Sequence, residues 1–223
     1  MIKFKSIARK VSDSFRNSQN LHSARCAQKL GYQHCFSEEL FLRDHLKNLD
    51  EKPKISVDIG CGFTPRNPFS AKKLIGFDLK ENVKLGVIYC DILAGQLPLA
   101  DSSIDVVTAF DFLEHIPRVL REDSKTCFPF IRLMDEIHRI LRPGGIFYHR
   151  TPAFPFKEAF QDPTHVNIIK EDTFPLYFCS NGDQDAWASI YGFAGSFTLV
   201  EQAWIGQSLL GIMRANKNVS KSI

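Results

Sequence analysis

The sequence predicts an α/β fold built from parallel β-α-β units, and three observations support this prediction. Short apolar runs that each end in an aspartate recur along residues 54–111. An amphipathic helical pattern over residues 130–141 lies between the last of these runs, residues 104–110, and a further apolar run at 146–149, which is typical of parallel strands joined by a crossover helix. Near the C-terminus, residues 197–205 and 209–213 form two strand-like runs around Gly206, which indicates an antiparallel hairpin.

The amino-acid composition excludes several classes of protein. The 223 residues are 44% hydrophobic and 24% charged, as in an ordinary soluble globular chain. The formal net charge of +3 comes from scattered basic residues, so we expect no nucleic-acid partner. No apolar run approaches the roughly 20 residues that span a bilayer, and basic residues interrupt any secretory signal. The six cysteines form no Cys-x-x-Cys pair, which favours buried free thiols, a cytoplasmic location and no structural zinc.

We expect residues 1–52 to form a helical cover, residues 53–216 the main domain and residues 217–223 a polar tail. One apolar stripe comprises Ile7, Val11 and Phe15, and a later one comprises Leu42, Leu46 and Leu49. Ser37 is a predicted N-cap, followed by Glu38 and Glu39 where the helix dipole favours acidic groups. These helices are expected to pack on the sheet or cover a ligand. A weaker alternative is that the basic first helix rests on an acidic membrane surface.

The first predicted strand, residues 54–57, runs into Asp58-Ile59-Gly60-Cys61-Gly62. A glycine pair after a strand lets the backbone turn sharply and lets a ligand approach closely. Asp78 ends the next apolar run twenty residues after Asp58, about the spacing at which an acid accepts hydrogen bonds from a ribose. Asp91 and Asp111 end two more runs, so four carboxylates are expected along one edge of the sheet.

The segment between Gly62 and Leu74 is short and contains Pro65 and Pro68. Proline inside a helix costs about 3 kcal/mol. We therefore expect the helix that usually follows a glycine turn to be shortened or replaced by a loop. Phe63-Thr64-Pro65 also stands where a third glycine would be expected.

These motifs together resemble the class I S-adenosylmethionine-dependent methyltransferases of the type 11 group. The matching segments occur in the family's order and are residues 57–62, 76–79, 90–92, 97–107, 113–116 and 138–145. The resemblance implies a Rossmann-like, doubly wound and mostly parallel sheet of about seven strands with a C-terminal antiparallel hairpin. It also implies S-adenosylmethionine as the cofactor.

The resemblance implies cofactor contacts for ten residues. They are Asp58, Gly60, Cys61, Gly62, Asp78, Leu79, Asp91, Ile92, Asp111 and Phe112. The glycine turn would surround the methionine and ribose, and Asp78 would accept from the ribose hydroxyls. Asp91 would bind the adenine amino group between Leu79 and Ile92, and Asp111 and Phe112 would face the sulfonium.

Methyl transfer to a hydroxyl needs an in-line acceptor and a base that takes its proton. Histidine suits this role, and two candidates follow predicted strands: His115, and His165 in the polar stretch 160–167. We predict His165 as the base, Asp162 as its orienter and His115 in reserve. The group Asp162-Pro163-Thr164-His165 resembles a motif of methyltransferases associated with bacterial surface polysaccharides, which suggests a sugar or glycan hydroxyl as the acceptor. A metal bound by Asp162 and His165 is a minor alternative, and no metal is predicted.

The sequence thus predicts an O-methyltransferase acting on a sugar or glycan. Two alternatives are a methyltransferase for a small-molecule or lipid-type acceptor and a non-catalytic, cofactor-binding subunit of a modification complex. A nicotinamide-dependent oxidoreductase is a further rival, which the glycine pair and Asp78 permit. Neither the acceptor nor the oligomeric state follows from the sequence.

Overall fold

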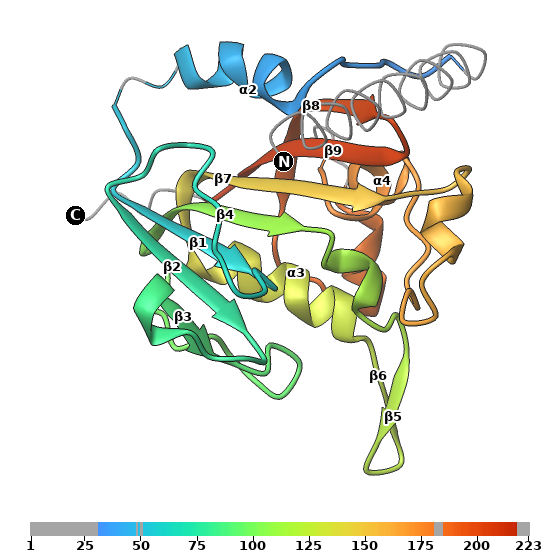
Figure 1. The fold of residues 1–223 in the computed structure, drawn as a ribbon. Coiled ribbons are helices and arrows are strands. Elements are labelled where there is room, and N and C mark those ends of the chain that lie inside the picture. The colour runs from blue at the N-terminus through green and yellow to red at the C-terminus, as the bar shows by residue number, and fades with distance from the viewer. Residues whose placement is uncertain (1–30, 48, 50, 181–184, 218–223) are drawn as a thin grey trace, which may run out of the picture.

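The computed structural model describes residues 31–47, 49, 51–180 and 185–217, and its centre is a seven-stranded sheet (Figure 1). The strand order is β3-β2-β1-β4-β7-β9-β8. The strands are β1 (Ile55–Ile59), β2 (Lys73–Asp78), β3 (Val87–Tyr89), β4 (Ile104–Phe110), β7 (Leu141–Pro152), β8 (Phe197–Ile205) and β9 (Ser208–Ala215). A separate two-stranded ribbon consists of β5 (Leu120–Glu122) and β6 (Lys125–Cys127).

The α-helices are α2 (Glu38–Lys47), α3 (Pro129–Ile140) and α4 (Thr173–Tyr177). Short 3-10 helices are η1 (Val83–Leu85), η2 (Leu113–His115), η3 (Lys157–Phe160) and η4 (Trp187–Tyr191).

Strands β3, β2, β1, β4 and β7 are parallel, and β9 is antiparallel to both β7 and β8. The hairpin predicted around Gly206 is therefore confirmed. Because the parallel strands point the same way, their carboxyl ends meet at one edge of the sheet, on the right in Figure 1. The mostly parallel sheet with a C-terminal hairpin confirms the predicted fold class.

One face of the sheet is covered by α3, whose apolar positions recur every three or four residues. Leu133, Met134, Ile137 and Ile140 are all buried against β1 and β4. Phe174 of α4 belongs to the same cluster. The helix ends at Ile140, and Leu141, which we expected on its apolar face, instead begins β7. The prolyl ring of residue 143 cannot continue a helix, so the chain extends directly into the strand.

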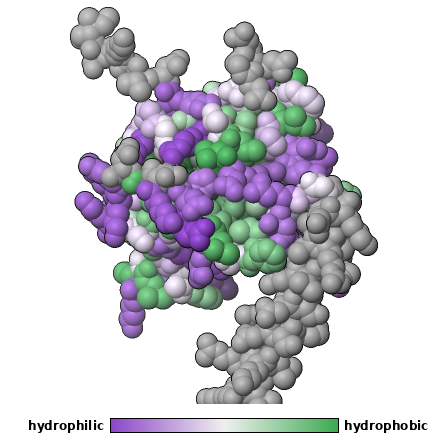
Figure 2. Space-filling view, turned by 90° about the horizontal axis from the view of Figure 1, so that it is seen from above, coloured by the Kyte–Doolittle hydropathy of each residue, from purple (hydrophilic) through white to green (hydrophobic). Residues whose placement is uncertain are grey.

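The opposite face is covered by α2, which lies above the sheet in Figure 1. Phe41 and Leu42 are buried in a second cluster with Tyr148 of β7, and Leu46 and Leu49 pack at its margin. The amide of Leu40 donates to Ser37 Oγ at 3.1 Å, so the predicted N-cap is confirmed. Viewed from this side, hydrophilic side chains form a broad band across the surface with hydrophobic groups beside it (Figure 2).

The segment between β1 and β2 contains no helix, as the prolines predicted. It is a loop whose Phe69 is 1% exposed and fills the cluster under α2. The loop thus covers part of a sheet face that a helix would otherwise cover.

Some expectations fall outside the described residues, notably the stripe of Ile7, Val11 and Phe15. The domain division at residue 52 stays a prediction. Cysteines 35, 61, 90, 127 and 179 are free, but only Cys179 is buried, so the expected burial holds for that thiol alone among those described. In the described part of the chain, no helix has the length and apolar composition that crossing a bilayer requires.

Candidate functional site

The glycine turn after β1 has one blocked side and one open side. Gly60 and Gly62 both have positive φ angles, of 62° and 61°. A Cβ on Gly60 would lie 2.0 Å from Phe112 Cδ2, whereas a Cβ on Gly62 would meet nothing within 4 Å. Phe112 therefore packs directly on the turn, and the open space for a ligand lies at Gly62.

Asp58 points into the protein. Its carboxylate is 1% exposed and accepts hydrogen bonds from the Arg66 amide at 2.7 Å and from Thr108 Oγ1 at 2.7 Å. Burial raises its pKa from the ordinary 3.8 to about 6, against the lowering effect of these two hydrogen bonds. Asp58 therefore ties the loop after the glycine turn to β4, a role that the sequence did not indicate.

Cys61 lies between the two glycines with its sulfur against Gly76 of β2. A Cβ on Gly76 would come within 2.7 Å of that sulfur. Burial, followed by the nearby carboxylates of Asp58 and Asp78, raises the pKa of the thiol to about 12. The thiol is thus protonated at neutral pH and serves in packing.

Asp78 lies at the end of β2 beside the glycine turn. One carboxylate oxygen accepts from the Gly62 amide at 2.8 Å, and the other accepts from the Lys80 amide at 3.2 Å. Leu79 follows with 63% of its surface exposed. An acceptor and an exposed apolar side chain at this edge are consistent with ribose and adenine contacts.

Asp91 and Ile92 follow β3. The Asp91 carboxylate is exposed and accepts from the Leu93 amide at 3.0 Å. Ile92 is half-buried and lines a cavity of about 530 Å³ together with α3. The adenine contacts of Asp91 and Ile92 stay a prediction.

Asp111 and Phe112 occupy the end of β4, next to the glycine turn. Asp111 has a positive φ of 51° and its carboxylate pairs with the guanidinium of Arg150 on β7. Arg150 also pairs with Glu38 of α2 at 3.2 Å. The carboxylate of Asp111 is therefore partly neutralised, and Asp111 lines a cavity at this edge of the sheet.

The structure brings the predicted histidines together. The rings of His115 and His165 meet edge to face with 4.9 Å between their centroids. Asp162 does not orient His165 through its side chain. Instead it accepts from Thr164 Oγ1 at 2.6 Å, and Thr164 Oγ1 lies 2.9 Å from His115 Nδ1. His165 Nδ1 lies 3.3 Å from the Ala159 carbonyl oxygen.

Glu114 completes this cluster, and we did not single it out from the sequence. Its side chain is 1% exposed, and one carboxylate oxygen accepts from Thr151 Oγ1 at 2.8 Å. The other oxygen, Oε1, lies 3.9 Å from His165 Nε2. Burial raises the pKa of Glu114 to about 7. The only sequence signal was its place beside His115, directly after a strand.

Asn167 and Arg118 form hydrogen bonds that hold the cluster in place. Asn167 Nδ2 donates to the Leu113 carbonyl at 3.0 Å, and its amide donates to the Glu114 carbonyl at 2.9 Å. Arg118 Nε donates to Asn167 Oδ1 at 2.6 Å. These bonds hold η2, which carries Glu114 and His115, against the loop that carries His165.

A cavity of about 900 Å³ opens over the cluster. Its lining is mainly polar and includes Glu38, Asp111, Glu114, His115, Arg150, Glu158, Gln161, Asp162, His165, Gln207 and Ser208. The predicted catalytic residues and Asp111 therefore share one chamber at the carboxyl edge of the sheet.

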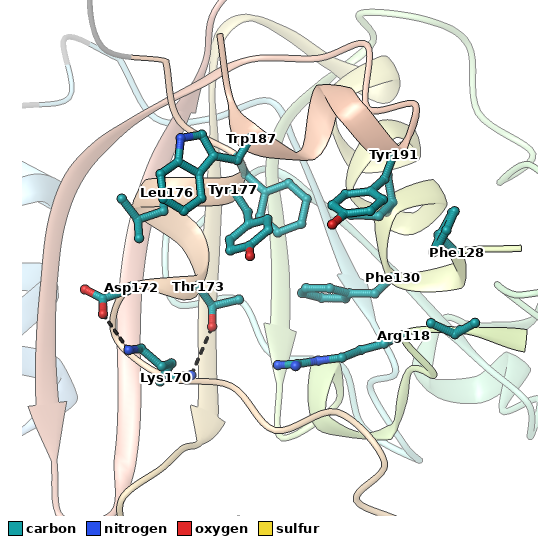
Figure 3. A pocket seen from close by; sticks show the side chains of 13 residues that line it. Arg118, Phe128, Phe130, Lys170, Asp172, Thr173, Leu176, Tyr177, Trp187 and Tyr191 are labelled. Carbon is teal, nitrogen blue, oxygen red and sulfur yellow. Dashed lines mark hydrogen bonds and ion pairs between the residues drawn. The ribbon is translucent and has the colours of Figure 1, made fainter. Parts of the chain in front are cut away.

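A second cavity, of about 500 Å³, lies beside α4 and η4. Figure 3 shows Trp187, Tyr177, Tyr191 and Phe130 around its opening, with Arg118 extending beneath Phe130. Its walls are aromatic, in contrast to the polar chamber above the histidines.

Comparison with known proteins supports the prediction over part of the chain. Residues 57–149 match the family described as "Methyltransferase domain". A Mycolicibacterium smegmatis protein, whose curated name assigns it to the S-adenosylmethionine-dependent methyltransferases, is 34% identical over 110 residues. That match covers 44% of this chain and 38% of the relative, so the chain spans well under half of the relative's length.

A solved structure from Bacillus halodurans C-125, described as a candidate methyltransferase, has the same fold. It aligns with a TM-score of 0.51 at 16% identity and covers 81% of this chain and 99% of its own. The sheet order and this alignment define the class I methyltransferase fold. Within that fold, residues 57–149 match a methyltransferase domain.

The residues at the sheet edge fit S-adenosylmethionine. The open side of Gly62, the Asp78 carboxylate, exposed Leu79 and the Asp91–Ile92 pair would hold it. Bound there, the cofactor supplies a methyl group on a positively charged sulfur. Asp58 fits only as a support, because it is 1% exposed and its oxygens bind within the protein, whereas Asp78 is only half-buried.

Proposed function

We propose that this protein methylates a hydroxyl group of a sugar or glycan in the cytoplasm, with S-adenosylmethionine as the methyl donor. The observation that carries the proposal is the polar chamber over His115, His165 and Glu114. Asp111 lines this chamber, and the next residue, Phe112, packs on the glycine turn. A hydroxyl-rich acceptor suits a chamber lined by carboxylates, amides and hydroxyls.

The chamber offers what transfer to a hydroxyl requires. An acceptor must lie within about 3–3.5 Å of the methyl carbon, in line with the bond that breaks. A nearby group must also favour loss of the hydroxyl proton. We assign this second task to the Glu114–His115–His165 cluster, with His165 as the proposed base.

The bonds around the histidines support this assignment. Thr164 donates to Asp162, so the oxygen of Thr164 accepts from His115 Nδ1–H. The Ala159 carbonyl likewise accepts from His165 Nδ1–H. In the neutral form, each ring then has its lone pair at Nε2, where a proton acceptor needs it.

The first test is binding of S-adenosylmethionine and S-adenosylhomocysteine by calorimetry, on the wild type and on Asp78→Ala. We expect micromolar binding that the variant weakens about 10- to 100-fold, since a charged hydrogen-bond acceptor is worth roughly 1.5–3 kcal/mol. Asp44→Ala, which removes an exposed carboxylate on α2, is the matched control. Binding of NAD in place of these ligands would support an oxidoreductase and overturn the proposal.

The second test is transfer of a labelled methyl group to sugars and glycans of defined structure, with small phenols and lipid headgroups in parallel. Alkali-stable label on a sugar is the expected result, because methyl ethers resist base. Label on a lipid or a small molecule would support the alternative acceptor class. Tight cofactor binding with no transfer to any of them would support the non-catalytic subunit.

A further inference from the structure

We propose that Glu114, His115 and His165 bind a divalent transition-metal ion of the Zn²⁺ or Co²⁺ type. Each offers one ligand atom, and these atoms all lie within 4.8 Å of one another. Two imidazoles and one carboxylate are a donor set that such ions take, with further positions left for water or substrate. No metal was predicted from the sequence, because Glu114 was not recognised as a third ligand.

One buried carboxylate oxygen of the cluster, Glu114 Oε1, lacks a hydrogen-bond partner among the described residues. Glu114 is 1% exposed. The nearest candidate, His165 Nε2, is 3.9 Å away, which is too long for a hydrogen bond. A buried carboxylate oxygen without a partner is costly, and a bound cation would remove that cost.

Hydrogen bonds to neighbouring groups fix all three side chains. The Glu114 carboxylate is fixed through Oε2 by Thr151, at 2.8 Å. His115 is fixed through Nδ1 by Thr164, at 2.9 Å, and Thr164 by Asp162, at 2.6 Å.

His165 is held in the same way, since its Nδ1 lies 3.3 Å from the Ala159 carbonyl. Metal-binding histidines almost always donate their other ring N–H to a carbonyl, carboxylate or similar acceptor, as both of these rings do. The three ligand atoms therefore match the inner shell of a metal site, and the hydrogen bonds made by the two Nδ1 atoms match its outer shell.

Local structure explains why the three residues meet. The 3-10 turn η2 places Glu114 and His115 in sequence directly after β4. The amides of Val166 and Asn167 both donate to the Glu114 carbonyl, at 2.9 Å each, and this brings His165 over the turn. The chamber of about 900 Å³ above the cluster gives an ion a path from solvent and room for an acceptor.

The role of the ion, unlike the site itself, rests on the proposed function. A hydroxyl bound to a divalent cation has a lowered pKa and gives up its proton more easily. In the transfer, the proton leaves to water, and the hydroxyl oxygen forms the new bond to the methyl carbon. The carbon–sulfur bond breaks, and its electron pair stays on sulfur. With the ion in place the histidines are ligands, and His165 is not itself the base.

The site is tested without any acceptor. Protein dialysed against chelator is titrated with Zn²⁺ by calorimetry and with Co²⁺ by visible absorption. We expect one equivalent to bind with micromolar or tighter affinity, and Co²⁺ to give d–d bands of low-coordinate nitrogen and oxygen ligation. Glu114→Gln and His165→Asn should each weaken binding at least 10-fold. Asp162→Asn, which changes the acceptor of the Thr164 hydroxyl behind His115, should weaken it about 10-fold.

The matched control is His45→Gln. His45 Nε2 pairs with Glu201 at 2.6 Å, so it is a second histidine–glutamate contact, but it is not part of the three-residue cluster. This variant should keep one equivalent of metal. Circular dichroism identifies any variant that fails to fold, and Glu114→Gln keeps a partner for Thr151. Less than one equivalent in the wild type, or equal losses in His45→Gln and the cluster variants, would overturn the site.

The two proposals fail separately. Metal binding without methyl transfer to any acceptor would leave the site in place and overturn the proposed function. Transfer that persists at full rate after the metal is removed by chelator would uphold the function and overturn the catalytic role of the ion.

Discussion

Phe112 occupies the space that a side chain on Gly60 would need. A Cβ at Gly60 would lie 2.0 Å from Phe112 Cδ2, although the two residues follow different strands, β1 and β4. Phe112 follows Asp111, which lines the chamber over the two histidines. We therefore expect a side chain at Gly60 to displace Phe112 beside this chamber.

Gly60→Ala should destabilise the protein and weaken cofactor binding, because it combines a positive φ with a clash. Left-handed backbone costs a non-glycine residue about 1–2 kcal/mol, and overpacking adds typically 1–3 kcal/mol. Gly62→Ala is the matched control, since its φ is nearly the same but its Cβ would be unobstructed. Urea unfolding should show a larger loss for Gly60→Ala, and equal losses would contradict the proposed contact.

The stability of the protein should depend on pH through Asp58. Its pKa in the folded state, about 6, lies above the ordinary 3.8. A raised carboxyl pKa means that the stabilising contribution is full below about pH 4 and is lost as pH rises through 6.

Asp58→Asn should remove this dependence. Asparagine can still accept from the Arg66 amide, while its side-chain NH₂ faces Thr108. Relative to the wild type, the variant should gain up to about 2–3 kcal/mol in the free energy of unfolding between pH 4 and pH 8. The measurement is urea unfolding of both proteins at the two pH values. A difference that does not change with pH would refute the assignment.

His149 should make the stability of the protein depend on pH in the opposite direction. It is fully buried, stacks on Phe174 with 3.9 Å between ring centroids, and burial lowers its pKa from 6.5 to about 3. A lowered histidine pKa makes the contribution full above pH 6.5 and lost as pH falls. The wild type should lose about 2 kcal/mol between pH 7 and pH 5 through this group.

His149→Met tests that loss, because methionine is apolar and adapts to irregular cavities. The variant should lack the component of acid destabilisation that His149 supplies, as seen from thermal or urea unfolding at pH 7 and pH 5. If both proteins lose the same free energy, His149 is not the titrating group.

The bridge from α2 to the sheet should be measurable by a double-mutant cycle. Arg150 pairs with Glu38 at 3.2 Å and also with Asp111. Arg150→Met should cost about 1–3 kcal/mol, because it leaves the half-buried Glu38 carboxylate and the more exposed Asp111 carboxylate without their cation. Glu38→Gln should cost less, and its effect should shrink by roughly 0.5–1 kcal/mol once Arg150 is absent. Glu39→Gln, on the same turn, is the control. Strict additivity would show that the bridge does not stabilise the fold.

Much of the fold follows from local patterns. Four apolar runs predicted strands, those before Asp58, Asp78, Asp91 and Asp111. Short apolar segments bounded by turn residues are typical of buried strands. The prolines at 65 and 68 predicted the missing helix, because proline removes a backbone donor and clashes with the preceding turn. The predicted α3 was one residue too long, since Leu141 continues the apolar pattern but starts a strand.

The side-chain arrangement at the site needed the tertiary structure. Asp58 looked like a cofactor ligand, yet it binds Thr108, fifty residues away, because β4 lies beside β1. Asp162 was expected to orient His165, its near neighbour, but it acts through Thr164 on His115.

The sequence by itself determined the strands, the hairpin, the glycine turn and the presence of two histidines after strands, since periodicity and turn chemistry are local properties. The tertiary structure alone decided which of these side chains face inward, which face the chamber and that Glu114 joins the histidines. The physical reason is that such contacts depend on strand order and on the direction of each side chain at the end of its strand, and neither is encoded in the residues nearest in sequence.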